Sequence, residues 1–496
     1  MIRLKKLTIK NIKNTRYGSI DFFESANGGS MLGIYGQNGS GKTSVIDAAE
    51  CMRLLMGGMP LPSGAADLLM RGERLCNFEF VFSFSDPGLF EDELVEISYG
   101  IVLADRAGEI KIENETLALN GEKRNKRNLI SYSVHSAIED GESSENFVLF
   151  EPSGRWKSIM ASSRSAAATF SASGIASFDL DKSFIFSEGF RNSLASFISV
   201  AQEKRTAGKA PGTLQTALPE TLEPLRVIVG KLCDFAHNDM VVINQKHEAV
   251  IPLGLMLLSS GQATCGSRGF VLDLDNPTPI SAEHYSSLCS ALDVSNLVLK
   301  RLIPGIEVEA YKLGDRVLDS GEAGVEFELL SNRNGTRVPL RCESTGIQKV
   351  VSILGALIAS YNNPDACIFI DEFDSGVFEY LLGELLEVME PRMKGQLVFT
   401  AHNLRPLEKL PLQSLVFTTS NPSNRFVRFK GLHGSNNVRS QYYKSIVLGG
   451  QNETLYQPTD KSLIAAAFSE AGHPSEDLDF STLLQRYRDD DAERRK

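Results

Sequence analysis

The sequence predicts an α/β fold with a mixed central sheet, and three observations lead to this prediction. Short apolar runs typical of buried strands recur along the chain, and segments with helical spacing separate them. A glycine-rich loop joins one such run, residues 31–35, to a helical segment, residues 43–55. Between residues 77 and 119, stretches that alternate apolar and polar side chains indicate an antiparallel meander.

The glycine-rich loop fits the phosphate-binding pattern G-x-x-x-x-G-K-[ST] at every fixed position. It consists of Gly36, Gln37, Asn38, Gly39, Ser40, Gly41, Lys42 and Thr43. Glycines let backbone N–H groups converge on nucleotide phosphates, and the following helix adds its positive dipole end. We expect Lys42 to reach the β- and γ-phosphates of ATP and Thr43 to bind Mg²⁺. The alternative is a glycine-rich turn before an ordinary helix; the strand and helix on its flanks favour the phosphate loop.

Length and composition restrict the class of protein. The 496 residues are too many for one simple core and indicate two or three structural units. No apolar run approaches the roughly 18 residues that span a bilayer, and no secretory signal is visible, so we expect no membrane partner. The seven cysteines lack C-x-x-C spacing, which fits a reducing cytoplasm without a zinc or disulfide framework. A net charge of −11 argues against broad binding of polyanions.

Residues 1–155 are predicted to form an N-terminal lobe with the phosphate loop and the meander. Residues 3–13 alternate apolar and polar side chains, and residues 19–23 are suited to pair with them. The meander consists of three runs, residues 77–84, 94–103 and 109–119. Its last turn, residues 122–127, is the densest basic cluster of the chain, and we interpret it as a solvated loop in preference to a nucleic-acid contact.

Residues 156–300 are predicted to form a mostly helical inserted region. Residues 160–177 are rich in serine and alanine, which indicates a boundary or a mobile connector. No heptad repeat persists, so we expect no long coiled-coil arm. The expected helices are residues 187–204, 221–236 and 283–302, and the strand-like segments are residues 240–244 and 249–258.

Residues 301–432 are predicted to form a C-terminal lobe, followed by a helical tail, residues 433–496. Strand patterns at residues 306–312, 324–330 and 338–341 precede an apolar helix, residues 350–361. The apolar run 367–370 ends in Asp371 and Glu372, and the run 396–400 is followed by Ala401 and His402. A carboxylate at the carboxyl end of a central strand lies beside the phosphate loop, where Asp371 can hold Mg²⁺ through water and Glu372 can activate the attacking water. The alternative for this pair is an acidic strand end without a role.

This order of motifs resembles the head of ABC-type ATPases, in the branch that contains SMC, RecF and the overcoming-lysogenisation-defect proteins. The resemblance covers about residues 1–60 and 300–430. The sequence of segments between residues 343 and 408 is similar to small stand-alone bacterial ATPases of the AAA class linked with phage defence. It implies a P-loop NTPase fold of the ABC-ATPase type. It also implies that Ser344 and Gly346 meet the γ-phosphate bound by a second subunit, that Glu372 is the general base and that His402 is the switch residue.

The sequence departs from this family at two places. The usual L-S-G-G-Q signature has Glu343, Thr345 and Ile347 in place of its leucine, first glycine and glutamine, and residues 373–376 do not reproduce the usual dimer loop. Ser344 also suits a helix N-cap, a role that is compatible with the signature. For His402 the alternative is an ordinary polar loop residue.

Two functions of different class agree with these motifs. The first is an ATP-hydrolysing homodimer, or higher even oligomer, that acts as a cytoplasmic switch for a separate effector protein in anti-phage defence. The second is a RecF-like repair or recombination ATPase that holds DNA across the dimer. Net acidity and the missing coiled coil favour the first. Because only residues 403–496 follow His402, we expect no nuclease module and no nuclease activity.

Overall fold

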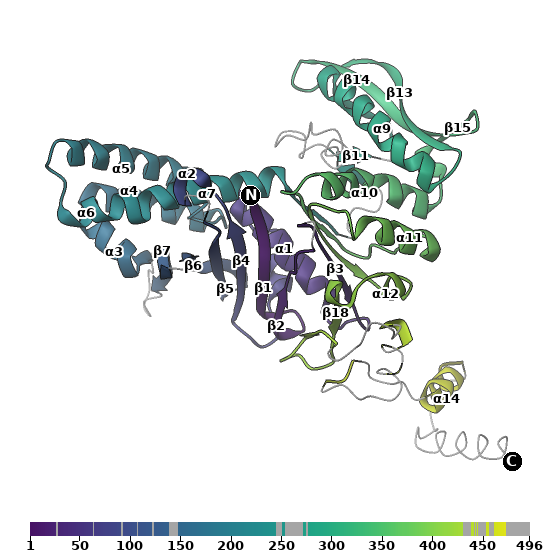
Figure 1. The fold of residues 1–496 in the computed structure, drawn as a ribbon, viewed down its shortest axis with the longest axis horizontal. Helices are drawn as coiled ribbons and strands as arrows, with labels where there is room; N and C mark the ends of the chain where they lie inside the picture. The colour runs from purple at the N-terminus through teal and green to yellow at the C-terminus, as the bar shows by residue number, and fades with distance from the viewer. Residues whose placement is uncertain are drawn as a thin grey trace.

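The computed structural model contains two β-sheets packed around a shared core, a helical arm and a small α/β unit (Figure 1). Among the residues that it describes, no helix has the length and apolar character needed to cross a membrane. The described residues are 1–25, 28–62, 64–90, 93–106, 108–121, 124–137, 147–244, 250–252, 271–273, 276–429, 438–440, 442, 444, 453–455 and 461–472.

Six strands form the central sheet, in the order β19-β18-β3-β17-β16-β9. All neighbouring pairs are parallel except β18 and β19, so the sheet is mixed, as predicted. The carboxyl ends of the parallel strands β3, β16 and β17 meet at one edge of the sheet, which is where α/β proteins bind ligands. The bounds are β3 Ser30–Tyr35, β9 Met240–Ile243, β16 Cys367–Ile370, β17 Gln396–Ala401, β18 Leu415–Thr418 and β19 Phe426–Val427.

Both faces of the central sheet are covered, which explains why its strands are continuous apolar runs. On one face, Leu32 and Phe369 share a core with helix α1 (Lys42–Met56) and with the antiparallel sheet. On the other face, Ile368 and Phe399 share a second core with the helices that follow the signature and β16. These helices are α10 Thr345–Asn362, α11 Glu379–Met389 and α12 Pro406–Lys409.

Seven strands form the antiparallel sheet, in the order β2-β1-β4-β5-β6-β7-β8. It contains the predicted meander in β4 to β6 and continues through β7 and β8. Gln396 ties it to the central sheet: its Oε1 accepts from Leu4 N at 2.8 Å and its Nε2 donates to Leu4 O at 2.9 Å. The bounds are β1 Ile2–Ile12, β2 Thr15–Asp21, β4 Leu75–Phe84, α2 Pro87–Phe90, β5 Val95–Arg106, β6 Glu109–Gly121, β7 Arg124–Ala137 and β8 Phe147–Pro152.

The helical arm confirms two predicted helices and contradicts one prediction. The prediction of a connector at residues 160–177 is wrong, because most of this segment lies in helix α4. Alanine is the strongest helix former, and Ser163 caps the helix by accepting from Ala166 N at 3.4 Å. The arm consists of α3 Gly154–Ala161, α4 Arg164–Asp179, α5 Glu188–Thr206, α6 Gly212–Ala217 and α7 Glu223–Asn238.

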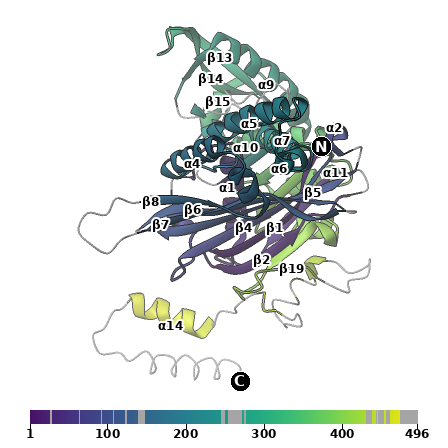
Figure 2. The same ribbon diagram turned by 90° about the vertical axis from the view of Figure 1, so that its left-hand side faces the viewer.

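The small α/β unit lies at the top of Figure 2, above the antiparallel sheet. Helix α9 packs on its four-stranded sheet, in which β12, β14 and β13 are neighbours in that order and β15 also pairs with β14. The strands predicted from residue 306 onward are therefore confirmed. The bounds are β12 Thr278–Ser281, α9 Ala282–Leu302, β13 Ile306–Val317, β14 Ala323–Arg333 and β15 Thr336–Pro339.

The division of the chain at residues 155, 300 and 432 stays a prediction. Strand β9, from within the predicted inserted region, pairs with β16 in the central sheet. The predicted strand at residues 249–258 is described only at β10 (Val250–Pro252), which pairs with β11 (Val271–Asp273). In the predicted tail, helix α14 (Lys461–Gly472) is described, whereas most of the other residues lie outside the described ranges.

Candidate functional site

The phosphate loop connects the end of β3 to the first turn of α1. Gly39 and Gly41 have left-handed backbones with φ of 74° and 91°, a conformation that glycine adopts without strain. Gly36 lies against β18, so a Cβ there would be 1.7 Å from Thr418 Oγ1. The Ser40 hydroxyl bonds to the same Thr418 Oγ1 at 2.5 Å. Strand β18 therefore supports a loop whose backbone has the curled form of a phosphate nest.

Lys42 is the buried cation of the loop. Its Nζ donates to Gly36 O at 2.9 Å and to Gln37 O at 3.2 Å. Burial lowers the pKa of Lys42, whereas the three carboxylates that follow β16 act on this pKa in the opposite direction. The ammonium is thus held by two carbonyl oxygens, which phosphate oxygens would replace when a nucleotide binds.

Two further segments hold the phosphate loop, and sequence reasoning missed both. Asn14, in the turn between β1 and β2, donates through Nδ2 to Gly39 O. The buried Arg425 donates to Asn14 O and, at 2.6 Å, to Thr419 O. A Cβ on Gly41 would be 2.7 Å from Thr15 Oγ1 in the same turn. Segments about 400 positions apart in the chain therefore fix the loop together.

Asp371 and Glu372 directly follow β16, and Thr400 of the neighbouring strand β17 holds both. Thr400 Oγ1 donates to Asp371 Oδ1 at 2.6 Å and accepts from Glu372 N at 2.8 Å. Asp371 is 2% exposed and Thr400 is fully buried. Glu372 has a φ of 45°, an uncommon and strained conformation for a residue with a side chain. The threonine hydroxyl accepts from the amide of this residue and so holds its strained backbone in place.

Asp374 joins the loops that follow β16 and β17. Its Oδ2 accepts from the backbone N of His402 at 2.9 Å and of Asn403 at 2.6 Å. The side chain of His402 is exposed at the end of β17, at the same edge of the sheet as the phosphate loop. Asp374 therefore holds the predicted switch residue beside Asp371 and Glu372. Sequence analysis did not single out Asp374, since its only signal was an aspartate two positions after the predicted base.

Ser344 and Gly346 lie at the N-terminus of α10. Ser344 occupies the N-cap position but makes no side-chain capping bond, and it is exposed. Gly346 packs tightly on the loop after β16, so a Cβ there would be 2.1 Å from Gly376 O. Gln348 donates to the carbonyl oxygens of residues 340, 341 and 343 and so braces the segment before the helix. The structure brings the predicted signature together with the loop that carries Asp374.

The site has few side chains suited to bind Mg²⁺, which agrees with the small number of protein ligands that this ion uses in nucleotide sites. Thr43 is exposed in the first turn of α1, and Asp371 Oδ1 accepts from Thr400 Oγ1, so Asp371 Oδ2 would be the oxygen that binds a hydrated ion. Mg²⁺ keeps several waters and uses one or two protein ligands together with substrate phosphates. Within the described ranges, no cluster of three or more His, Cys, Asp or Glu residues forms a metal site of its own.

The comparisons with known proteins agree with this class of site. Residues 6–182 match the family model of the AAA domain, AAA_23. No curated protein sequence matches the chain significantly.

Three solved structures illustrate the similar folds. The Smc head domain with an extended coiled coil bound to the C-terminal domain of ScpA, from Pyrococcus furiosus, is 13% identical, with a TM-score of 0.41 over 86% of this chain and 96% of that chain. The SMC head domain from Thermotoga maritima is 16% identical, with a TM-score of 0.31 over 86% and 100%. The recombination mediator protein RecF of the RecFOR pathway is 13% identical, with a TM-score of 0.35 over 84% and 97%.

The fold class predicted from the sequence is confirmed. The phosphate loop after β3, the strand order of the mixed sheet and the match to an AAA domain define a P-loop fold of the ABC-ATPase type. ATP binding, ATP hydrolysis and the roles of the individual residues are the subject of the proposal below.

Proposed function

We propose that the chain hydrolyses ATP in a Mg²⁺-dependent site and works as a dimeric switch. The observation that carries the proposal is the edge of the central sheet, where Lys42, Asp371, Glu372 and His402 follow three neighbouring strands. Such an arrangement has a cation for the phosphates, a carboxylate for the metal and a second carboxylate for the attacking water.

The role of each residue follows from its position. Lys42 binds the β- and γ-phosphates, Thr43 and Asp371 hold Mg²⁺, and His402 contacts the γ-phosphate. Glu372 is the general base, because it follows the metal ligand Asp371 at the end of β16 and its backbone is held by Thr400. A positioned base contributes roughly 10²–10⁴ in rate, so Glu372→Gln should bind ATP but turn it over slowly.

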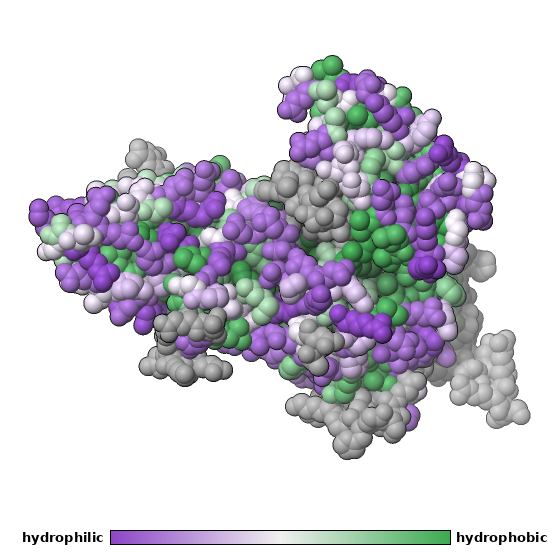
Figure 3. All heavy atoms as spheres, turned by 45° about the horizontal axis from the view of Figure 1, so that its top comes forward, coloured by the Kyte–Doolittle hydropathy of each residue, from purple (hydrophilic) through white to green (hydrophobic). Residues whose placement is uncertain are grey.

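Two features support a site shared between two chains. The exposed Ser344 makes no capping bond, so its hydroxyl is available to the ATP of a second chain. Next to the Gly376 contact, Phe378 is 72% exposed and Tyr380 is 50% exposed, which suits a surface that closes on a partner copy. Figure 3 shows apolar atoms gathered right of centre, below the small α/β unit, whereas the arm on the left is mostly hydrophilic.

Mixing two inactive variants tests the shared site. Lys42→Ala removes the phosphate contact, and Ser344→Arg blocks the signature without touching the phosphate loop. Gly346→Asp is unsuitable, since any Cβ at that position collides with Gly376 O of its own chain. Each variant should release no phosphate alone, and a 1:1 mixture should recover about a quarter of wild-type turnover, because half of the dimers have one intact site of two.

Ser320→Arg, at an exposed serine of the β13–β14 turn, is the matched control and should hydrolyse ATP normally. Full activity of the Ser344→Arg homodimer would contradict the shared site. Mixed chains that associate, as measured by light scattering, without recovering any turnover would do the same.

Control of a separate effector in phage defence is proposed on the sequence resemblance alone. A RecF-like role on DNA competes with it, and the basic turn was its main sequence support. The predicted loop is wrong for residues 124–127, which lie in strand β7. Arg127 of this strand donates to Glu220 O at 2.8 Å, and Arg155 pairs with the Glu220 carboxylate at 2.8 Å. Residues 122 and 123 lie outside the described ranges. Stimulation of ATP turnover by DNA would favour the RecF-like role, and co-purification of a second protein would favour the switch.

A further inference from the structure

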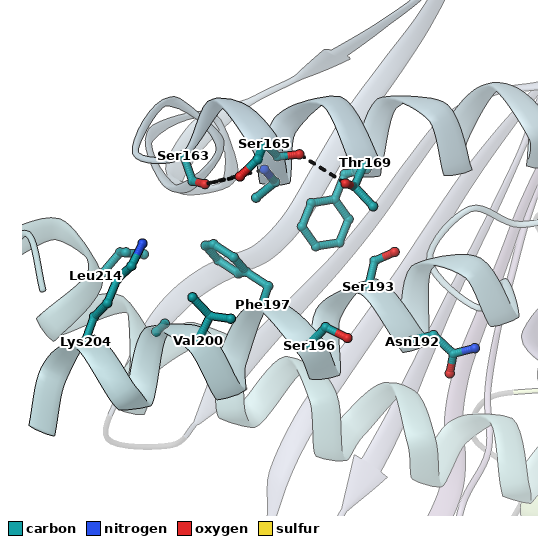
Figure 4. Close-up of a pocket in the computed structure, with 13 residues that line it drawn as sticks. Ser163, Ser165, Thr169, Asn192, Ser193, Ser196, Phe197, Val200, Lys204 and Leu214 are labelled. Carbon is teal, nitrogen blue, oxygen red and sulfur yellow. Dashed lines mark hydrogen bonds between the residues drawn. The ribbon is translucent and has the colours of Figure 1, made fainter.

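A cavity of about 380 Å³ lies between helices α4 and α5 of the arm (Figure 4). In Figure 1 the arm extends to the left, whereas β3 and α1, which flank the phosphate loop, lie near the centre. The cavity is therefore separate from the candidate ATP site. Its volume is within the range of about 300–1,000 Å³ that is usual for small-molecule sites.

The cavity exists because the two helices face each other with small side chains. Ala166 and Thr169 of α4 line one wall, and Ser193 and Ser196 of α5 line the other (Figure 4). Ser165, Thr169 and Ser196 are exposed, so the cavity is open to solvent along the surface of the arm.

Polar and apolar side chains both line the cavity. The hydroxyl groups of Ser163 and Ser165 bond to each other at 3.3 Å, and the Thr169 hydroxyl donates to Ser165 O at 3.1 Å. Of the thirteen lining residues, all within the described part of the chain, Lys204 alone carries a charge. Its side chain points toward α4 at the end of the cavity in Figure 4. The polar end therefore suits an anionic group.

The floor is aromatic and separates the cavity from a second one. Phe170 lines both the large cavity and a neighbouring cavity of about 150 Å³. The inner cavity has mainly aromatic and apolar walls, among them Trp156 and Phe184. The Phe170 ring is 3% exposed and lies 6.1 Å from the Phe197 ring and 5.3 Å from the Trp156 ring, measured between centroids. Phe170 is therefore packed between the two cavities, against the rings of Trp156 and Phe197.

We propose that the arm binds an amphipathic monoanion, a carboxylic acid with an apolar chain or ring. The anionic group pairs with Lys204 and accepts from the hydroxyl groups of the walls. The apolar part lies over Phe170 and Phe197 and reaches toward the inner cavity. This assignment does not depend on ATP hydrolysis, because none of its residues belongs to the nucleotide site.

Fluorescence titration with 8-anilinonaphthalene-1-sulfonate, an aromatic monoanion, tests the site in the full-length chain with excess ATP present. We expect saturable binding to the wild type. Ser196→Phe fills the cavity and should weaken this binding at least about tenfold. Ser199→Phe, on the same helix but outside the cavity, should leave it unchanged. Equal affinities of Ser196→Phe and the wild type, with both chains folded by circular dichroism, would overturn the proposal.

Charge reversal and competition test the chemical class of the ligand. Lys204→Glu should weaken binding of the probe, whereas Arg205→Glu, at the next position and outside the lining, should not. Decanoate should displace the probe from the wild type. Equal effects of the two charge reversals, or no displacement by decanoate, would overturn the assignment to an amphipathic monoanion.

Discussion

Thr400→Val tests how the candidate site is built. Valine has nearly the shape of threonine and lacks its hydroxyl, so packing in β17 is kept. The bond to Asp371 Oδ1 at 2.6 Å and the acceptor for Glu372 N at 2.8 Å are lost together. Because Thr400 is fully buried, water cannot replace the hydroxyl without opening the sheet.

The structure sets the size of the effect. A hydrogen bond to a charged group contributes about 1.5–3 kcal/mol, and an unsatisfied buried amide costs about 1–3 kcal/mol. The strained backbone of Glu372, with a φ of 45°, loses the acceptor that holds it and is free to relax. A positioned base contributes a factor of roughly 10²–10⁴ to the rate, so a partly misplaced base should reduce kcat on the order of 10- to 100-fold. Lys42 and the phosphate loop are untouched, so the Kd for ATP should change little.

Phosphate release measures kcat, and calorimetric titration measures the Kd for ATP. Thr400→Ser keeps the hydroxyl and is the matched control, so its kcat should stay close to that of the wild type. The reasoning is refuted if the valine variant turns over ATP at the wild-type rate. It is refuted as well if the serine and valine variants lose the same activity, because the loss would then come from the missing methyl group.

Two further predictions concern stability. Gln396→Leu removes both bonds to Leu4, leaves two buried backbone groups without partners and should cost about 2–4 kcal/mol, measured as a fall in Tm. Burial raises the pKa of Glu115, whose side chain accepts hydrogen bonds from Ser183 Oγ and Phe184 N. Protonation of Glu115 therefore stabilises the folded chain fully below the unfolded pKa of about 4.3, and this stabilisation is lost as the pH rises through the folded pKa. Glu115→Gln stays neutral, so the Tm of this variant minus that of the wild type should grow with rising pH; a constant difference would show that Glu115 does not titrate in this way.

The elements of the ATPase core could be predicted because their signals are local. The strands that precede Gly36 and Asp371 are buried on both faces, and so they are apolar throughout and short. The phosphate loop has a fixed spacing that its backbone geometry requires. The prediction for residues 160–177 was wrong because it gave the serine-rich composition more weight than the helix propensity of the alanines and the cap at Ser163.

The supports of the site could not be predicted, because each depends on a partner far away in sequence. In the sequence, Thr400 looks like any other residue of a buried strand. Only the pairing of β16 with β17 shows that its hydroxyl binds Asp371 Oδ1 and Glu372 N. Likewise, Arg425 and Asn14 meet across 411 positions. The cavity of the arm depends on the packing of α4 against α5, which no periodicity specifies.

The loop after β16 connects every part of the candidate site that the sequence treated as separate. It begins at Glu372, holds His402 through Asp374 and carries Gly376, whose carbonyl group fits only because position 346 has no Cβ. A shift of His402 toward or away from a γ-phosphate would pull on Asp374 and, through Gly376, on the start of α10. In the dimer that we propose, the signature of a chain would then respond to the nucleotide bound by that same chain, although the proposal assigns Ser344 to the ATP of the second chain. In that proposed dimer, this connection would make closure at one site depend on the occupancy of the other.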